Sequence, residues 1–301
     1  KSAGSTLLEK MRTSRSSDVR IVALQTLKQL GDSSLGKAIQ TALNDRDPAL
    51  RVAALGLVPA LDVPDARKVD LLSLVFQRRS IEDQQVALQA LAEMPLEKTR
   101  PLLGRLTKQL RDGKLLPEVH LDLEETLSAL EANDLLDQLP HLAEADNHEP
   151  TWEAYKVALN GGDAKKGARI FYRNAAAQCV RCHLIGDWGG EVGPELSAIG
   201  HELSREQLLQ SLVAPSMRIA PGYGMVSLTL NDGTTISGVL KKETEEHIHL
   251  ENGDQKEKVA KADVKERTAL PSSMPNQGLL LSKRDIRDLV EFLSTLKPEN
   301  S

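Results

Sequence analysis

The chain has 301 residues and a formal net charge of −5. This length suits two domains, and the acidic balance provides no general basic surface of the kind that binds nucleic acid. Hydrophobic residues make up 40% and charged residues 27%, an ordinary balance for a globular protein. No run of about 18 apolar residues occurs, so the sequence predicts no membrane-spanning helix.

An internal repeat runs through residues 1–158. Segments 21–27, 52–58 and 85–91 share an apolar Ala-Leu pattern and align at offsets of 31 and 33 residues. Each lies in an amphipathic helical pattern that a second such pattern follows. The predicted helices are 18–30 with 34–44, 48–61 with 65–78, 81–93 with 96–111, and 117–132 with 133–145. This period, with two helices per unit, indicates an α-solenoid, for which an irregular helical bundle is the alternative.

Local signals support these helix limits. Asp47 can cap a helix that starts at Pro48, since proline lacks the N–H that would go unpaired there. Gly31 and Gly113 follow predicted helices, where a left-handed residue is favoured. The pattern Asp-x-x-(Leu/Val)-Arg-x-x-Ala-Leu at 47–55 resembles HEAT repeats. That resemblance implies an array that binds partners or spaces domains.

The only two cysteines lie in the sequence Cys179-Val-Arg-Cys182-His183. The spacing C-x-x-C-H is the attachment signature of c-type haem, because two thiols can add to the vinyl groups and the imidazole can bind the iron. A redox dithiol would need a thioredoxin-like βαβ pattern, and a zinc site would need further ligands. A disulfide across so few residues is sterically awkward. The motif therefore predicts one covalent haem c, with His183 as an axial ligand.

The flanking segments resemble the terminal helices of class I cytochromes c. The motif G-D-x-x-x-G-x-x-x-F at 162–171 precedes the haem motif, and residues 281–293 match the C-terminal helix, with a weak capping box at Ser282. In that fold a small residue on one helix admits an aromatic ring from the other. The resemblance implies that Gly167 and Phe292 make this contact.

Residues 192–196, Val-Gly-Pro-Glu-Leu, resemble the G-P-x-L segment of the same fold. There the proline carbonyl accepts a hydrogen bond from the second nitrogen of the haem histidine, which fixes the ring and strengthens the ligand. The resemblance implies that Pro194 supports His183 and that Leu196 packs on the haem. The simpler interpretation of Gly-Pro is a turn.

The second axial ligand is predicted to be Met274. It precedes Pro275 shortly before the last predicted helix, as in the distal loop of class I cytochromes. A thioether opposite an imidazole suits electron transfer. Met217 and Met225 are alternative ligands. A bis-histidine haem is a further alternative, although two of its three candidates alternate with apolar residues and should lie on an exposed strand face; the candidates are His201, His247 and His249.

A β-like segment separates the haem motif from Met274. Apolar residues alternate on both sides of Asn231-Asp232-Gly233, a strong hairpin turn. The predicted strands are 226–230, 236–240, 246–250, 255–260 and 263–268. The predicted fold class is therefore mainly α. A HEAT-like α-solenoid at 1–158 precedes a class I cytochrome c-like helical domain at 159–301, which a small antiparallel β module interrupts at about 222–268.

This combination resembles a haem-binding domain of large planctomycete and verrucomicrobial proteins, where it often follows HEAT-like repeats and a propeller-type dehydrogenase domain. The resemblance covers residues 160–298 and includes specific motifs. Besides the haem motif they are 193–196, 199–200, 204–209, 214–216, 221–223, 232–233, Gly238, 274–275 and 289–290.

The predicted haem with His183 and Met274 as ligands favours an electron-transfer module over an enzyme, although such a module can also be one domain of a larger oxidoreductase. It would take electrons from a dehydrogenase partner or a fused domain and pass them to a cytochrome or an oxidase. Haem is attached outside the cytoplasm, so we expect a periplasmic or other extracytoplasmic location and a removed signal sequence. The alternatives are a haem enzyme or gas sensor with an open distal site, and a binding scaffold built on the repeats.

Overall fold

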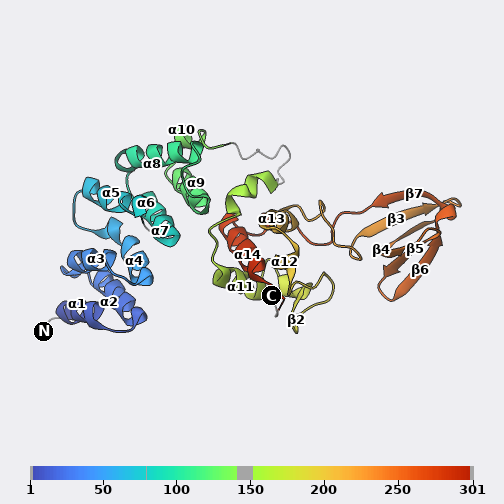
Figure 1. Ribbon diagram of the computed structural model, residues 1–301, viewed down its shortest axis with the longest axis horizontal. Coiled ribbons are helices and arrows are strands. Elements are labelled where there is room, and N and C mark those ends of the chain that lie inside the picture. Colours follow the sequence, from blue (N-terminus) through green and yellow to red (C-terminus); the bar gives the residue numbers. More distant parts are fainter. Residues whose placement is uncertain (1–2, 79, 141–151, 299–301) are drawn as a thin grey trace. The chain divides into compact units, whose positions relative to one another are not determined.

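The computed structural model describes residues 3–78, 80–140 and 152–298, and the chain divides into two compact units, Lys1–His141 and Leu142–Ser301 (Figure 1). The described chain is mainly helical with a small antiparallel sheet, which confirms the predicted class. The predicted boundary after residue 158 differs, because Tyr155 and Ala158 are buried in the core of the second unit. In the described residues no helix is long and apolar enough to cross a membrane.

The first unit is built from helices joined by short turns, and successive helices such as α3 and α4 pack on each other. The helices are α1 Ala3–Thr13, α2 Ser17–Gln29, α3 Leu35–Leu43, α4 Pro48–Leu55, α5 Asp65–Ser73, α6 Val75–Arg78, α7 Ile81–Ala92, α8 Leu96–Arg111, α9 His120–Ala129 and α10 Asn133–Leu136, with 3-10 turns η1 Val58–Ala60 and η2 Pro117–Val119.

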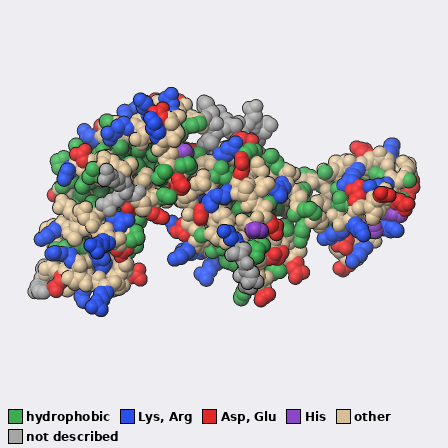
Figure 2. Space-filling model, viewed as in Figure 1, with side chains coloured by type: hydrophobic (Ala, Val, Ile, Leu, Met, Phe, Trp, Pro, Cys, Tyr) green, Lys and Arg blue, Asp and Glu red, His purple; other side chains and the backbone are tan. Residues whose placement is uncertain are grey.

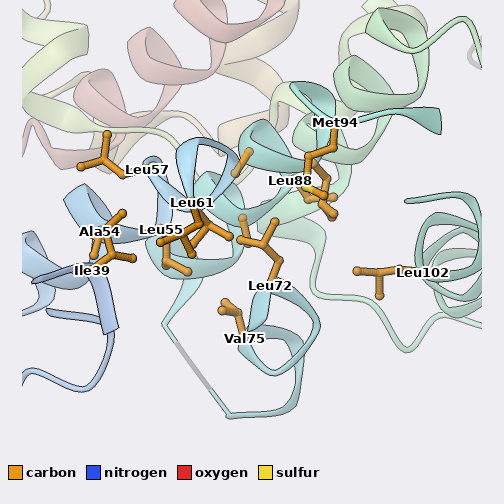
Figure 3. Close-up of a cluster of buried hydrophobic side chains, with 14 of the residues drawn as sticks. Ile39, Ala54, Leu55, Leu57, Leu61, Leu72, Val75, Leu88, Met94 and Leu102 are labelled. Carbon is orange, nitrogen blue, oxygen red and sulfur yellow. The ribbon is translucent and has the colours of Figure 1, made fainter. Parts of the chain in front are cut away.

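One hydrophobic core runs through this unit. Its residues recur at intervals of three and four, as at Leu88 and Leu91 in α7, because this spacing places them on one helix face. Figure 3 shows Leu55, Leu61 and Leu72 from successive segments lying together. Burial of each such side chain contributes about 1.5–3 kcal/mol. Packing therefore holds these short helices, which would be marginal in isolation.

The helix ends follow their local signals. Asp47 accepts a hydrogen bond from the N–H of Ala49, as predicted for the residue before Pro48. Gly31 and Gly113 adopt φ angles of 57° and 67° at helix ends, which confirms the predicted left-handed positions.

The predicted helix 48–61 is wrong in its length. It ends at Leu55, and the 3-10 turn η1 follows. Pro59 has no N–H and cannot continue the hydrogen bonds of an α-helix. The predicted helix 133–145 begins at Asn133 but ends at Leu136, and its last five residues lie outside the described residues.

The second unit contains a helical part and a sheet. Ser204 and Ser282 cap α13 and α14 with capping boxes, and Asp163 caps α11. The elements of the helical part are η3 Trp152–Ala158, α11 Ala164–Arg173, η4 Cys179–Arg181, the hairpin strands β1 Leu184–Ile185 and β2 Trp188–Gly189, α12 Ile199–Glu202, α13 Arg205–Val213, η6 Gln277–Leu279 and α14 Lys283–Thr295.

Helices α11 and α14 cross at Gly167. A Cβ atom at this position would lie 2.0 Å from the carbonyl oxygen of Asp288 and 2.7 Å from Cβ of Phe292. The ring of Phe292 lies beside that of Phe171, with centroids 5.8 Å apart. The contact between Gly167 and Phe292 implied by the cytochrome resemblance is therefore present.

The sheet has five antiparallel strands in the order β6-β5-β4-β3-β7. Alternate residues of the strands form its core, and Figure 2 shows acidic and basic side chains close together on the surface of these strands. The turn at 231–233 joins β3 to β4, and Gly233 has a φ of 88°. The strands, all near their predicted limits, are β3 Met225–Leu230, β4 Thr235–Glu243, β5 His247–Asn252, β6 Gln255–Ala260 and β7 Val264–Ala269.

The chain enters and leaves this sheet at one place. Val226 at the start of β3 pairs with Ala269 at the end of β7, and the N–H of Leu270 donates to the carbonyl of Met225 at 2.9 Å. The two connecting segments therefore run together between the sheet and the helices (Figure 1).

Candidate functional site

A cavity of about 320 Å³ lies in the second unit, between its helices and the two segments that connect them to the sheet. Its walls are mainly apolar and include Phe171, Leu208 and Leu289. All six residues that the sequence singled out line it; they are Cys179, Cys182, His183, Pro194, Leu196 and Met274. The fold thus brings the haem motif and the predicted methionine to one space.

The imidazole of His183 is held in one orientation. Its Nδ1 lies 2.9 Å from the carbonyl oxygen of Pro194. Because a carbonyl only accepts, Nδ1 donates this hydrogen bond, and in the neutral ring the lone pair is therefore on Nε2. Gly193 lies directly against the ring, since a Cβ there would be 2.7 Å from Cε1 of His183. The side chain therefore offers an unprotonated nitrogen of the kind that binds a metal.

Cys179 and Cys182 lie at the two ends of one 3-10 turn, η4. The N–H groups of Cys182 and His183 donate to the carbonyl of Cys179 at 3.1 and 3.0 Å. Both thiols are free. Burial raises the pKa of the Cys179 thiol to about 11, so this thiol is protonated at neutral pH and exchanges poorly with disulfides. This property disfavours the redox-dithiol alternative.

The segment after the haem motif is fixed to it through the backbone. The N–H of Gly190 donates to the carbonyl of Val180 at 2.9 Å, and the N–H of Gly193 donates to the carbonyl of Cys182 at 2.7 Å. Residues 184–189 form the hairpin β1–β2 between these bonds. The hairpin and the attachment turn therefore form one braced structure.

Met274 reaches the cavity from the connector that follows β7. Its N–H donates to Oγ of Ser272 at 3.2 Å, and the N–H of Ser272 donates to Oγ of Ser216 on the other connector at 3.1 Å. Gln277 is buried and donates through Nε2 to the carbonyl of Pro275 at 3.2 Å. Hydrogen bonds thus set the path of the loop that presents the thioether.

The competing ligands lie elsewhere. The side chain of Met217 is 62% exposed, and Met225 lies in β3; among the described residues neither lines the cavity. His247 and His249 lie on β5, opposite its buried residues, as the alternation predicted. His201 is exposed on the short helix α12. Of these candidates, all of them described residues, Met274 alone lines the same cavity as His183.

The cavity fits a haem in size and in its polar groups. Cofactor pockets typically occupy about 300–1,000 Å³. Arg218 is the only Lys or Arg among the residues described as lining the cavity, and in the described chain it has no carboxylate partner. A haem carboxylate can supply that partner. Within the described structure the buried Oε1 of Gln277 also has no hydrogen-bond partner, and the residue is part of the cavity lining.

The described residues contain no group of three or more His, Cys, Asp or Glu side chains arranged to hold a metal ion. An iron in this cavity would therefore take most of its ligands from a macrocycle, with His183 and Met274 as the protein ligands. A closed zinc site, which needs four such ligands, is not present in the described residues.

Sequence reasoning missed Arg218 and Gln277. Arg218 lies in a connector without periodicity, so no helix or strand pattern marked it. A signal was nevertheless present, because Arg218 is the one cation between 214–216 and 221–223, two segments that resemble the haem-binding family. Gln277 carries no comparable signal, since a single glutamine near a turn is common.

Comparison with known proteins adds no family name. A scan against protein-family models and a search of curated proteins each found no match. A function for this chain is therefore argued from the cavity and its residues.

Proposed function

We propose that residues 159–301 form a c-type cytochrome module for electron transfer, with one haem c attached through Cys179 and Cys182. The observation that carries this proposal is the convergence of the haem motif and Met274 on one apolar cavity, where the ring of His183 is already oriented. The motif alone could be an ordinary turn, and the cavity alone could serve another ligand. Their coincidence is what supports a haem site.

Each residue has a defined part in this proposal. The two thiols form the thioether links, His183 and Met274 are the axial ligands, and Leu196 packs on the macrocycle. Pro194 keeps the proton on Nδ1 of His183, which leaves Nε2 for the iron. Bound haem supplies a one-electron change at iron. The apolar walls exclude water and so limit the reorganisation that accompanies a change of charge.

Electron transfer is favoured over catalysis or gas sensing because His183 and Met274 both line the cavity and would together hold a bound haem iron. An enzyme or sensor needs a vacant or easily displaced position with polar groups beside it. The loop of Met274 is held by Ser272 and followed by Pro275, which supports a fixed ligand. The donor would be a dehydrogenase partner or fused domain and the acceptor a cytochrome or oxidase, in a periplasmic or other extracytoplasmic location.

The proposal extends to the finer fold. The close crossing of α11 and α14 at Gly167 supports a class I cytochrome arrangement, into which the β module at about 222–268 is inserted. Residues 1–158 would be a HEAT-like α-solenoid that positions the module. Two arginines one repeat apart support this: Arg20 pairs with Asp45 in the loop before α4, and Arg51 pairs with Asp83 in the first turn of α7.

Absorption spectroscopy of the full chain matured with haem tests the proposal. We expect a low-spin spectrum in both oxidation states, with the weak far-red band of methionine–iron ligation in the oxidised protein. Met274→Ala should abolish that band, while Met217→Ala, at an exposed position, should retain it. A high-spin oxidised spectrum, or fast CO uptake by the reduced wild type, would contradict a closed electron-transfer site.

A further inference from the structure

We propose that an exposed patch beside the haem motif is the docking surface for a redox partner with a basic surface. This patch, here named the hairpin patch, consists of Asp187, Trp188, Glu191, Val192 and Glu195. The proposal rests on the electron-transfer function, because a partner must approach the redox centre closely only if electrons pass between them.

The hairpin patch leaves a large apolar side chain in water. All five of its residues are exposed. Val192, 70% exposed, and Glu195 also line the cavity, so the large apolar side chain that stays in water beside a filled cavity is that of Trp188, which is 77% exposed. Among the described residues, Trp188 contributes to no hydrophobic core, so the folding of this unit does not account for it. Tryptophan is among the residues most enriched at energetically dominant positions of protein interfaces.

Charge defines the kind of partner. Residues 182–204 contain four acidic residues and no Lys or Arg. The nearest cation along the chain, Arg181, is exposed beside the hairpin and donates to the neutral Oε1 of Gln178 at 2.6 Å; with its one positive charge included, this surface still has an excess of negative charge. In the described structure Asp187 and Glu191 form no ion pair, so their charges are not neutralised locally. A negative surface around an apolar centre attracts a partner with lysine and arginine around its own centre and speeds their association at low salt.

The position of the patch connects it to the candidate redox site. A Cβ at Gly189 would lie 2.0 Å from the carbonyl oxygen of His183, so the hairpin lies directly on the haem motif. The bonds from Gly190 and Gly193 to the attachment turn fix this arrangement. A partner seated on the patch would exchange one electron with the site at short range, with no bond made or broken.

The test measures electron exchange by stopped flow with the haem-loaded full chain. The probes are a lysine-rich small cytochrome, an acidic small cytochrome and a small neutral quinol. We expect the lysine-rich probe to react faster than the acidic probe, and its rate to fall as salt rises. Trp188→Ala should lower the rate with the lysine-rich probe about tenfold or more. The double change Asp187→Asn with Glu191→Gln should lower it several-fold and weaken its salt dependence.

Two controls separate docking from other effects. Leu74→Ala and Glu97→Gln, both exposed in the first unit, should leave all rates unchanged. Rates with the quinol should be the same in every variant, because a small neutral molecule needs no docking surface. A wild-type rate with Trp188→Ala, or no preference for the basic probe, would overturn the proposal. Failure of the electron-transfer function itself would look different: the wild type would lack the low-spin spectrum or would not react with the quinol.

Discussion

Gly193 sets the geometry of the histidine on which the candidate site depends. Its backbone lies so close to the ring of His183 that a Cβ would reach 2.7 Å from Cε1. The neighbouring carbonyl of Pro194 can therefore accept the proton of Nδ1 at 2.9 Å. The ring is oriented by the protein alone, which lowers the cost of ligand ordering when a cofactor binds.

Gly193→Ala should displace this ring. We expect loss of the Nδ1–H hydrogen bond, observed in haem-free protein as loss of the slowly exchanging imidazole N–H resonance by NMR, and a smaller low-spin fraction after haem loading. Gly104→Ala is the matched control, because a Cβ there meets no atom within 4 Å and a helical glycine gains roughly 0.5–1 kcal/mol on change to alanine. An unchanged resonance in Gly193→Ala would show that the loop can shift without cost.

Asp288 gives the unit a predictable response to pH. Its carboxylate accepts from the N–H of Asp163 at 2.8 Å, but burial raises its pKa above the ordinary value. The folded protein therefore binds this proton more tightly than the unfolded chain does. Tighter proton binding by Asp288 therefore contributes to the free energy of unfolding. The contribution is fully present below the unfolded pKa of about 3.9 and is lost as the pH rises through the raised folded pKa.

Asp288→Asn keeps an acceptor for Asp163 but carries no charge. We expect it to increase the free energy of unfolding at pH 7 and to lose that advantage below pH of about 4, where Asp288 is protonated in both states. Urea unfolding at several pH values measures both effects. Glu245→Gln, at an exposed position of the sheet, serves as the control and should be neutral. A destabilised Asp288→Asn at neutral pH would mean that the ionised carboxylate is needed.

At the scale of elements, the close crossing of α11 and α14 depends on Gly167, which has no Cβ atom. The Cβ of an alanine at 167 would lie 2.0 Å from the backbone oxygen of Asp288, which cannot move without moving α14. We expect Gly167→Ala to destabilise the second unit by roughly 1–3 kcal/mol, the usual cost of overpacking. Urea unfolding measures this. Gly36→Ala in α3, where a Cβ would meet its nearest atom at 3.9 Å, should not destabilise the chain.

Much of each element could be predicted from sequence because its signals are local. The turn at 231–233, the caps at Asp47 and Ser204 and the alternation on β5 each depend on a few adjacent residues. Helix 48–61 was predicted too long because the apolar period continues past Gly56 while Pro59 prevents the hydrogen bonds. The spacing of apolar residues indicates which face of a helix is buried. It does not show where a proline, which lacks a backbone N–H, ends the helical hydrogen bonds.

The cavity could be predicted only in part. The Cys-x-x-Cys-His motif, Pro194 and Met274 carry recognisable patterns, whereas Arg218 lies in an irregular connector and Gln277 begins the short turn η6. The pairing of β3 with β7 brings the two connectors together, and no short-range pattern specifies which strands of a sheet become neighbours. Met274 depends on the same pairing and was identified only through its motif, so Arg218 and Gln277, which have no motif of their own, were missed.

At the scale of the whole molecule, the two units have separate hydrophobic cores. Leu103 in α8 is fully buried in the first core. Leu103→Ala should destabilise the first unit by roughly 2–5 kcal/mol, because it leaves a cavity. The far-ultraviolet circular dichroism signal comes mainly from helices, so part of it should be lost at a lower temperature as the first unit unfolds. In protein loaded with the proposed haem, the absorption of the second unit should change at its original temperature, and a shift of both signals would show that the units unfold together.

The chain enters the sheet at the start of β3 and leaves it beside that point, at the end of β7. This arrangement affects which parts of the sequence can change during evolution. Met225 and Leu270 are hydrogen-bonded neighbours. The chain therefore returns to the helical part of the unit close to the point where it left it, as it would after a single turn. Within the sheet, Leu240 and Lys241 of β4 also bond the connector, at Gly224 and Gly222. We therefore expect the strands and turns beyond these contacts to tolerate insertion, deletion or exchange, while the residues that meet the connector stay as they are.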